Sequence, residues 1–408
     1  MFPAAAAVKK GARVEVMRTQ VAIVGAGPAG LVLAHLLSRT GIDCVVLEAR
    51  SQQYVEQRVR AGVLEHPTVQ LLCDTGVGRR LQEEGLSHRG IRLRFDGADH
   101  LLDFVALIGR SITVYGQQEV VKDLIEARLA AGGPVFFEVG GVRLSGLDTD
   151  EPEVAFTGGD GVERILRAEV VAGCDGFHGV CRPSVPTRHL QVFEREYPFA
   201  WLGILAKAAP VQPEVTYAYS DRGFALASMR STEISRLYLQ VGPDEALDAW
   251  PDGRIWEELN ARLALDRGFV LNEGPVLERG VTTMRSFVVE PMRYGRLFLA
   301  GDAAHIVPPT GAKGMNLAVA DVAVLAEALE RFFATGATDL LDGYSERCLR
   351  RVWRAEHFSW WMTSMLHLTP GADAFERRLQ LAQLRYVTSS QAAAISLAEN
   401  YTGLPYGS

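Results

Sequence analysis

A glycine-rich turn between a short strand and a helix constrains this chain more than any other part of it. Residues 20–24 form a compact β-type run, a G-x-G-x-x-G turn with Gly25, Gly27 and Gly30 follows, and the next residues are helical in composition. A second short strand ends at Glu48, 18 residues after Gly30. An acid at an offset of about 20 residues is the group that binds a ribose hydroxyl in dinucleotide-binding βαβ units. The order of these elements therefore predicts a dinucleotide site.

A second glycine-bearing segment, residues 301–316, lies between an apolar strand and a long helical pattern. Asp302 directly follows the strand, where its carboxylate can accept hydrogen bonds from sugar or ribityl hydroxyls. At the other end, the backbone N–H groups of Met315 and Asn316 open the helix and favour negative charge in front of them. By itself this segment is consistent with a tight connection holding a structural aspartate or with a ligand site. The glycine turn supplies the second signal and favours the ligand site.

A third buried strand also ends in an acid and glycines, at Asp175. Three strand ends, at Gly25, Asp175 and Asp302, thus carry ligand-type residues. In a doubly wound sheet the ligand lies at the carboxyl ends of the strands, so distant loops can converge on one extended cofactor. We predict a mixed α/β fold with a Rossmann-like nucleotide-binding domain.

Between residues 197 and 289 the pattern changes to alternating strands with aromatics, which predicts an inserted, largely antiparallel layer. Period-2 alternation places Ser228, Arg230, Arg236 and Tyr238 on one face of adjacent strands. If that face is exposed to solvent, the arginines are unremarkable. If it covers the cofactor loop, Arg230 is a fork that binds a carboxylate.

Composition narrows the function classes. The net charge of −7 and the absence of a basic stripe argue against a nucleic-acid partner, and no apolar run approaches the ~20 residues that span a membrane. Five scattered cysteines favour reduced thiols and no metal site, as in a cytoplasmic protein. Residues 1–16 are read as a disordered extension.

The motifs resemble those of the class A flavoprotein monooxygenases, the FAD-dependent aromatic hydroxylases. The resemblance extends over about residues 17–406. It rests on these segments: Gly25–Gly30, Gly173-Cys174-Asp175-Gly176 with Phe177-His178-Gly179, residues 60–65, residues 115–117, residues 285–291, Gly301–Asn316 and residues 358–364.

The resemblance implies a discontinuous FAD-binding domain. We expect it in residues 17–180 and 286–343, with the substrate-binding sheet in residues 181–285. A C-terminal helical segment, residues 344–408, would carry the interface of a homodimer.

The implied activity is hydroxylation of 4-hydroxybenzoate at C3 to 3,4-dihydroxybenzoate. Reduced FAD would react with O2 to a flavin hydroperoxide, whose distal oxygen an electron-rich ring attacks, and NADPH or NADH would supply the electrons. Two alternatives remain: a hydroxylase for another aromatic acid, such as 4-aminobenzoate or a substituted hydroxybenzoate, and a non-enzymatic binding protein that has lost FAD.

The resemblance also implies individual roles. Tyr217 would bond the phenolic oxygen, Tyr401 and His88 would relay its proton, and the carbonyl of Pro309 would accept from the substrate hydroxyl. From the sequence alone, His88 reads as a surface residue after a turn. The substrate would further contact Ser228, Arg230, Arg236, Tyr238 and Thr310. FAD would contact Gly25, Gly27, Gly30, Glu48, Arg60, Gln117, Asp302, Met315 and Asn316.

The nicotinamide cofactor has no Rossmann site of its own, because the chain holds a single G-x-G-x-x-G. By resemblance it would bind transiently to Arg58, Arg60, His178, Arg182 and Arg285. NADPH-preferring members tend to carry an arginine directly after the ribose-binding acid, and here Ala49 stands there with Arg50 next. We therefore expect NADPH to work with weak discrimination against NADH.

Overall fold

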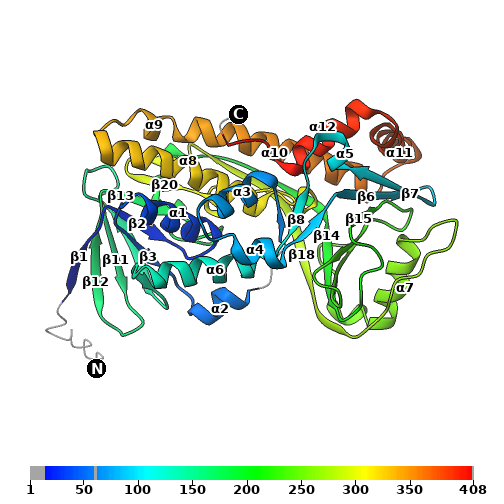
Figure 1. The fold of residues 1–408 in the computed structure, drawn as a ribbon, viewed down its shortest axis with the longest axis horizontal. Helices are drawn as coiled ribbons and strands as arrows, with labels where there is room; N and C mark the ends of the chain where they lie inside the picture. Colours follow the sequence, from blue (N-terminus) through cyan, green and yellow to red (C-terminus); the bar gives the residue numbers. More distant parts are fainter. Residues whose placement is uncertain (1–13, 59–61, 407–408) are drawn as a thin grey trace, which may run out of the picture.

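The structure, a computed structural model, describes residues 14–58 and 62–406. Figure 1 shows two lobes: a nucleotide-binding sheet with its helices on the left and a large antiparallel sheet on the right, with helix α10 (Tyr344–Leu366) running along the top. Among the described residues, no helix is long and apolar enough to cross a membrane.

The left lobe is built on a six-stranded sheet of short strands, of which the four between the edge strands are fully buried. Its central strands are parallel, as expected for apolar runs that are buried on both faces. Helices α1 (Pro28–Arg39), α6 (Gln117–Ala130) and α8 (Gly314–Thr335) pack on it. In spatial order the strands are β19 (Arg293–Tyr294), β20 (Leu297–Leu299), β13 (Val170–Gly173), β2 (Val21–Val24), β3 (Cys44–Leu47) and β9 (Val135–Phe136).

Two smaller sheets flank this lobe. The first contains β1 (Glu15–Arg18), β12 (Glu163–Arg167), β11 (Glu153–Thr157) and β10 (Gly140–Ser145). Glu15 and Val16 therefore belong to a strand, although they fall in the expected disordered extension; they pair in parallel with Arg164 and Ile165. The expectation was wrong for these two residues because an edge strand paired far along the chain leaves no local signal, and residues 1–13 lie outside the described residues. The second sheet contains β4 (Val63–Leu64), β8 (Ile112–Val114) and β5 (Leu86–His88).

The right lobe is an eight-stranded, mostly antiparallel sheet. Its strands, in spatial order, are β21 (His305–Ile306), β18 (Val276–Glu290), β14 (Gln191–Ala206), β17 (Ser235–Val241), β16 (Ala225–Met229), β15 (Val215–Ala218), β6 (Gly90–Phe95) and β7 (Ala98–Asp103). The two long strands β14 and β18 reach back to the left lobe (Figure 1).

The strands of this sheet do not all come from the predicted substrate domain. Strands β6 and β7 belong to it, although they lie within residues 17–180, which we assigned to the FAD-binding domain. The parallel pairing of β6 with β15 brings Ile91 beside Val215. Strand alternation shows that a segment is a strand, but it does not show which sheet the strand joins. The division into domains remains a prediction.

The remaining helices cover the rims of both lobes. They are α2 (Gln52–Gln57), α3 (His66–Asp74), α4 (Arg79–Glu84), α5 (Phe104–Ile108), α7 (Asp252–Arg262), α9 (Asp339–Asp342), α11 (Ala374–Ser389) and α12 (Gln391–Thr402). Short 3₁₀ turns are η1 (Arg182–Ser184), η2 (Thr187–His189), η3 (Leu247–Ala249), η4 (Gly301–Ala303) and η5 (Pro309–Gly311). The C-terminal helices do more than cover the surface, because α12 inserts Tyr401 into the apolar core beneath the right-hand sheet.

A buried histidine joins α10 to that core. His367 accepts the indole N–H of Trp201 on Nε2 at 2.6 Å and contacts the carbonyl of Thr363 through Nδ1 at 3.0 Å. Its ring stacks on Phe224 at 4.2 Å between centroids. Burial lowers the pKa of His367 to about 3, so the ring is neutral in the fold.

His367 makes folding stability depend on pH. Its pKa is about 3 when folded, against an ordinary 6.5, so its stabilising effect is complete above pH 6.5 and is lost as the pH falls toward 3. Between pH 6.5 and 5 we expect the free energy of unfolding of the wild type to fall more steeply than that of His367→Gln, by up to about 1.4 kcal/mol per pH unit. The exposed His357→Gln is the control, and urea unfolding at several pH values is the measurement. Parallel slopes for all three proteins would contradict the assignment.

Candidate active site

Packing within the chain requires two of the three glycines in the glycine turn, but it does not require the third. Gly25 has a positive φ of 109°, and a Cβ there would lie 2.3 Å from the carbonyl oxygen of Cys174. A Cβ on Gly30 would lie 1.9 Å from the carbonyl oxygen of Gly25. Gly27 is different, because a Cβ there would meet nothing within 4 Å. The close packing of the chain explains two of the glycines, and the third leaves room for a ligand's pyrophosphate at the start of α1.

Glu48 closes the same turn from the end of β3. One carboxylate oxygen accepts the N–H of Ala26 at 2.8 Å and the other accepts the N–H of Arg50 at 2.8 Å. Each carboxylate oxygen has two acceptor positions, so capacity for ribose hydroxyls remains. The acid is thus held at the carboxyl edge of the sheet, where the sequence analysis expected it.

The other two strand ends lie at the same edge. Strands β20, β13 and β2 are adjacent and parallel, and the N–H of Ala300 bonds the carbonyl of Gly173 at 3.0 Å. Asp302 follows within the short turn η4. Asp175 accepts the N–H of Cys181 at 2.8 Å, so this acid organises its own loop.

The opening of α8 is fastened by the side chain of Asn316. Its amide oxygen accepts the N–H of Glu65 at 2.9 Å, and its amide nitrogen donates to the carbonyls of Val63 and Ala312, each at 3.0 Å. No side chain among the described residues caps α8. The N–H groups of its first turn, Met315 included, have no acceptor within the helix, so they suit an anionic ring edge.

Two tyrosines meet in the apolar core beneath the right-hand sheet. The hydroxyls of Tyr217 on β15 and Tyr401 on α12 are 2.5 Å apart, and Tyr217 also donates to the carbonyl of Thr310 at 3.2 Å. Burial raises the pKa of both phenols, so both are neutral. Pro309 precedes Thr310 in η5 and is exposed. The predicted phenol-binding residues are therefore close together.

The arginine face forms as predicted. Cross-strand register pairs Ser228 with Arg236, and Tyr238 lies on the same face, where its hydroxyl accepts from Nε of Arg236 at 3.2 Å. Arg230 follows the end of β16. Its Nε and one terminal nitrogen are enclosed and have no hydrogen-bond partner in the described part of the chain, and burial lowers its pKa. A desolvated, incompletely paired guanidinium is costly, and a ligand carboxylate would satisfy it.

His88 is buried, which corrects the reading of a surface turn. It ends strand β5, whose pairing with β8 turns the ring inward, and 1% of the residue is exposed. Burial lowers its pKa to about 4; the carboxylate of Glu214 opposes this effect and Arg230 adds to it. Neither ring nitrogen has a partner in the described residues, and no direct hydrogen bond joins the ring to Tyr401. A relay between the two needs a bridging water.

Three of the residues expected to bind nicotinamide lie close together in the structure. His178, Arg182 and Arg285 all lie around Phe177, with the guanidinium carbons of the two arginines 4.6 and 4.9 Å from its ring centroid. Arg182 also donates to the carbonyl of Ala303 at 2.9 Å, so it supports the fold as well. Arg58 is exposed at the end of α2, and Arg60 lies outside the described residues.

Two residues beside the site were missed from the sequence. Lys313 is buried and its ammonium donates to Glu65 at 2.6 Å and to the carbonyl of Tyr401 at 3.1 Å, which ties the C-terminal helix to the loop before α8. A lysine between two loop glycines was the available signal. At the start of α6, the side-chain oxygen of Gln118 is enclosed without a partner in the described chain, so Gln118 is a further cofactor candidate beside the predicted Gln117.

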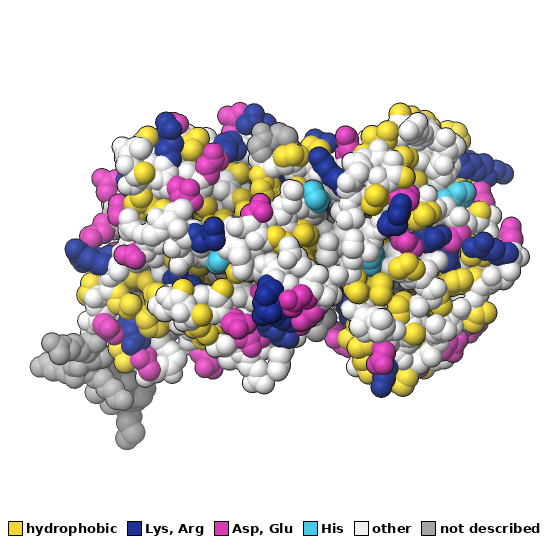
Figure 2. Space-filling view, in the orientation of Figure 1, with side chains coloured by type: hydrophobic (Ala, Val, Ile, Leu, Met, Phe, Trp, Pro, Cys, Tyr) yellow, Lys and Arg dark blue, Asp and Glu magenta, His cyan; other side chains and the backbone are white. Residues whose placement is uncertain are grey.

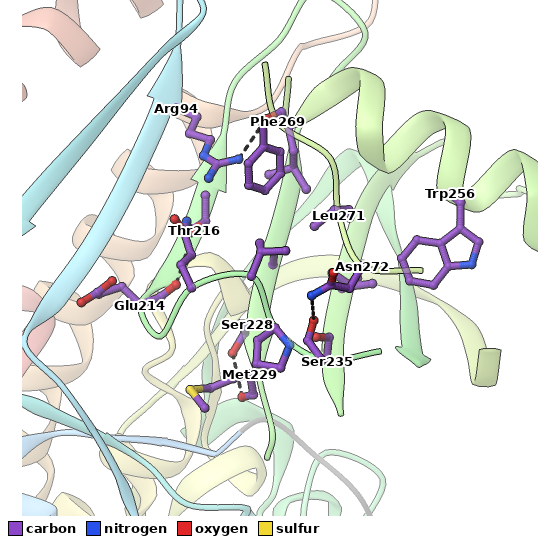
Figure 3. Close-up of a pocket in the computed structure, with 17 residues that line it drawn as sticks. Arg94, Glu214, Thr216, Ser228, Met229, Ser235, Trp256, Phe269, Leu271 and Asn272 are labelled. Carbon is purple, nitrogen blue, oxygen red and sulfur yellow. Dashed lines mark hydrogen bonds between the residues drawn. The ribbon is translucent and has the colours of Figure 1, made fainter. Parts of the chain in front are cut away.

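The cavity in Figure 3 is a different feature. Its walls include Arg94, Phe269 and Trp256, and the paired residues Ala227 and Leu237, which alternate with the Ser228–Arg236 pair. The guanidinium of Arg94 stacks on Phe269 at 3.9 Å. This cavity therefore lies behind the substrate strands, and of the predicted site residues it includes Ser228 alone.

Comparisons with known proteins agree with this geometry. The FAD binding domain family matches residues 18–359. The chain is 49% identical over 393 residues to the p-hydroxybenzoate hydroxylase of Acinetobacter baylyi, covering 96% of this chain and 97% of that protein. It is 30% identical to a 3-(3-hydroxy-phenyl)propionate/3-hydroxycinnamic acid hydroxylase of Mycobacterium avium, over 80% of this chain and 57% of that one. The crystal structure of a p-nitrophenol 4-monooxygenase from Pseudomonas putida has the same fold, with a TM-score of 0.81 at 21% identity, covering 96% and 99% of the two chains.

The chain belongs to the FAD binding domain family and, within it, to the FAD-dependent aromatic hydroxylases. It is a flavin-dependent monooxygenase, and the relative that it matches from end to end is a p-hydroxybenzoate hydroxylase. The open space at Gly27 and the free acceptor capacity of Glu48 fit FAD as the cofactor.

The space at Gly27 yields a test that separates binding from folding. In Gly27→Ala the added methyl meets only the ligand, so we expect the FAD dissociation constant to rise at least tenfold while the melting temperature of the apoprotein stays within about 2 °C of wild type. Gly253→Ala, which adds a methyl in open space on α7, should leave both values unchanged. Flavin fluorescence titration and thermal unfolding give the two readouts. Unchanged FAD affinity in Gly27→Ala would show that the turn does not contact the cofactor.

Proposed function

We propose that the protein hydroxylates 4-hydroxybenzoate at C3, giving 3,4-dihydroxybenzoate, with O2 and NAD(P)H as cosubstrates. The proposal rests on the presence of two groups in the right lobe. One is the incompletely paired guanidinium of Arg230, and the other is the pair of contacting phenols, Tyr217 and Tyr401. A para-hydroxy acid presents a carboxylate at one end and a phenol at the other, which matches these two groups. The name of the Acinetobacter relative supports the same substrate.

FAD would be held by the turn from Gly25 to Gly30, by Glu48 and Asp302, and by the first N–H groups of α8 at Met315 and Asn316. Gln118 would supply a further polar contact. When bound, FAD in its reduced form supplies the activation of O2 that a ring alone cannot achieve.

The carboxylate of the substrate would be gripped by Arg230 in a two-pronged ion pair, aided by the hydroxyls of Ser228 and Tyr238. Arg236 holds the Tyr238 hydroxyl in place at 3.2 Å. A carboxylate here removes the cost of leaving Arg230 incompletely paired, which favours its binding.

At the other end, the substrate hydroxyl would donate its single hydrogen either to the Pro309 carbonyl or to Tyr217, and the second bond starts the relay. The proton would pass from Tyr217 to Tyr401 across their 2.5 Å contact and on, through water, to His88. His88 is neutral at working pH and can accept it transiently. Loss of this proton makes the ring more electron-rich at C3, where oxygen is added.

For the electron donor we propose a transient site around Phe177, formed by His178, Arg182 and Arg285. Arg58 and Arg60 would contribute from the loop after α2. Ala49 takes the place after the ribose-binding acid, so we propose that NADPH and NADH both serve, with little discrimination.

A homodimer is proposed from the outer face of the C-terminal helices. Phe375, Leu379 and Tyr386 on α11 are 69%, 56% and 56% exposed, and Trp360 on α10 is 41% exposed. Large apolar side chains gathered at a surface favour a protein partner, and a second copy is the simplest. Sedimentation equilibrium tests it.

A cytoplasmic location is proposed from the cysteines. All five are free thiols, and four are buried. Thiols that persist unpaired suit a reducing compartment. Figure 2 shows acidic and basic side chains intermixed over the face it presents, as on an ordinary water-exposed surface.

The function is tested by anaerobic reduction of the FAD-loaded protein by NADPH and by NADH, each with and without 4-hydroxybenzoate. In the family that the sequence resembles, reduction is gated by substrate, so we expect 4-hydroxybenzoate to accelerate it strongly with both donors. Stopped-flow absorbance of the flavin is the measurement. A preference above a hundredfold for one donor would refute the weak discrimination proposed here. Equal acceleration by a benzoate without the phenol, or a response to 4-aminobenzoate alone, would assign the pocket to another aromatic acid.

The role of Arg230 is tested by Arg230→Lys. Lysine keeps the charge but loses the planar fork, so we expect the dissociation constant of 4-hydroxybenzoate to rise at least tenfold, or about 1.4 kcal/mol, with FAD affinity unchanged. Arg222→Lys, at an exposed arginine on the neighbouring turn, is the matched control. If both variants bind the acid as the wild type does, another cation holds the carboxylate.

A further inference from the structure

A buried carboxylate inside α8 has no part in the reaction described above. Asp321 is 1% exposed, and a charge so placed is costly unless it is paired. Its Oδ2 atom accepts the N–H of Gly301 at 2.9 Å and lies 2.6 Å from Nε2 of His305, which is also 1% exposed. One oxygen atom thus joins both ends of the turn that carries Asp302.

That turn is held closely against the helix. Gly301 has a positive φ of 63°, and a Cβ there would lie 3.0 Å from the Cβ of Ala318, one helical turn before Asp321. Behind the turn, the N–H of Val289 bonds the carbonyl of Ala304 at 2.9 Å, and His305 pairs with Val288 in the sheet. The turn is therefore held by Asp321, by the close packing of Gly301 on Ala318 and by the sheet contacts of residues 304 and 305. Asp302 lies in the middle of this turn.

The surroundings of His305 favour its cationic form. Carboxylates approach it from three elements: Asp321 on α8, Asp302 in η4 and Glu356 on α10. Burial by itself lowers the His305 pKa, but these carboxylates outweigh burial and the net direction is upward. Below this raised pKa the contact is an ion pair, in which each partner compensates for the burial of the other.

We propose that Asp321 and His305 are positioning residues for FAD binding: their buried ion pair holds both ends of the Gly301–His305 turn so that Asp302 meets the cofactor. Neither side chain touches the cofactor itself. The inference rests on the proposed role of Asp302 as an FAD contact, and it is independent of which aromatic acid is hydroxylated.

The test is a double-mutant cycle on FAD affinity. Asp321→Asn keeps the shape of the side chain and removes the charge that holds His305. We expect the FAD dissociation constant to rise about tenfold or more in this variant, and more than that in Asp302→Ala. The double variant should bind FAD no more weakly than Asp302→Ala, because positioning no longer matters once the contact is gone. Flavin fluorescence titration of each apoprotein is the measurement.

Controls separate positioning from general destabilisation. Asp123→Asn changes a half-buried helical aspartate, which accepts from Tyr115 at 2.7 Å and pairs with Arg80 at 2.6 Å, away from the turn. We expect it to lower the melting temperature of the apoprotein by as much as Asp321→Asn does and to leave FAD affinity within twofold of wild type. Additive effects of Asp302→Ala and Asp321→Asn, or an equal loss of FAD affinity in Asp123→Asn, would overturn the proposal.

The same samples distinguish this proposal from the proposed function. Titration of FAD-saturated wild type with 4-hydroxybenzoate reports on the substrate alone. If the wild type fails to bind that acid while the cycle is non-additive, the substrate assignment falls and the positioning role stands. If Asp302→Ala binds FAD as tightly as the wild type, the positioning role falls whatever the substrate is.

Discussion

The carboxyl edge of three adjacent parallel strands is the constraint on which the rest of the structure depends. There the glycine turn after β2 approaches the backbone of Cys174 so closely that Gly25 has no room for a side chain. The next strand end, at Ala300, bonds Gly173, and the Asp302 turn follows it. Because these contacts are between backbones, the three loops stand in a fixed relation, and a cofactor that spans them meets a preformed surface.

Two buried cations of this protein each lie against a carboxylate. Lys313 is matched by Glu65 and His305 by Asp321, each pair at 2.6 Å. Arg230 differs from them and from the other described arginines, because two of its donor atoms are enclosed without a partner, against one at most elsewhere. Desolvation makes an unmatched cation costly, so its retention points to a partner that arrives with the ligand. That is why Arg230, among the many arginines, supports a substrate assignment.

Local patterns predicted much of this arrangement. The second strand of the glycine-turn unit, Cys44–Leu47, ends within one residue of the predicted Glu48, and the predicted C-terminal helical segment begins with α10 at Tyr344. Both are long or apolar enough to outweigh their context. The face shared by Ser228, Arg236 and Tyr238 follows from strand alternation and is confirmed by the register. His88 was misread because a polar neighbourhood resembles a turn, whereas its burial depends on the partner strand β8.

By itself the sequence determined the class of the cofactor site and the kinds of chemical group that the chain can bring to it. The spacing of glycines, an acid and apolar runs is a local property that survives any arrangement of the rest of the chain. Only the tertiary structure decided which residues meet: Tyr217 with Tyr401 across 184 positions, Lys313 with Glu65 across 248, and β6 with β15. Such pairings depend on how sheets and helices pack, and no local sequence pattern indicates them.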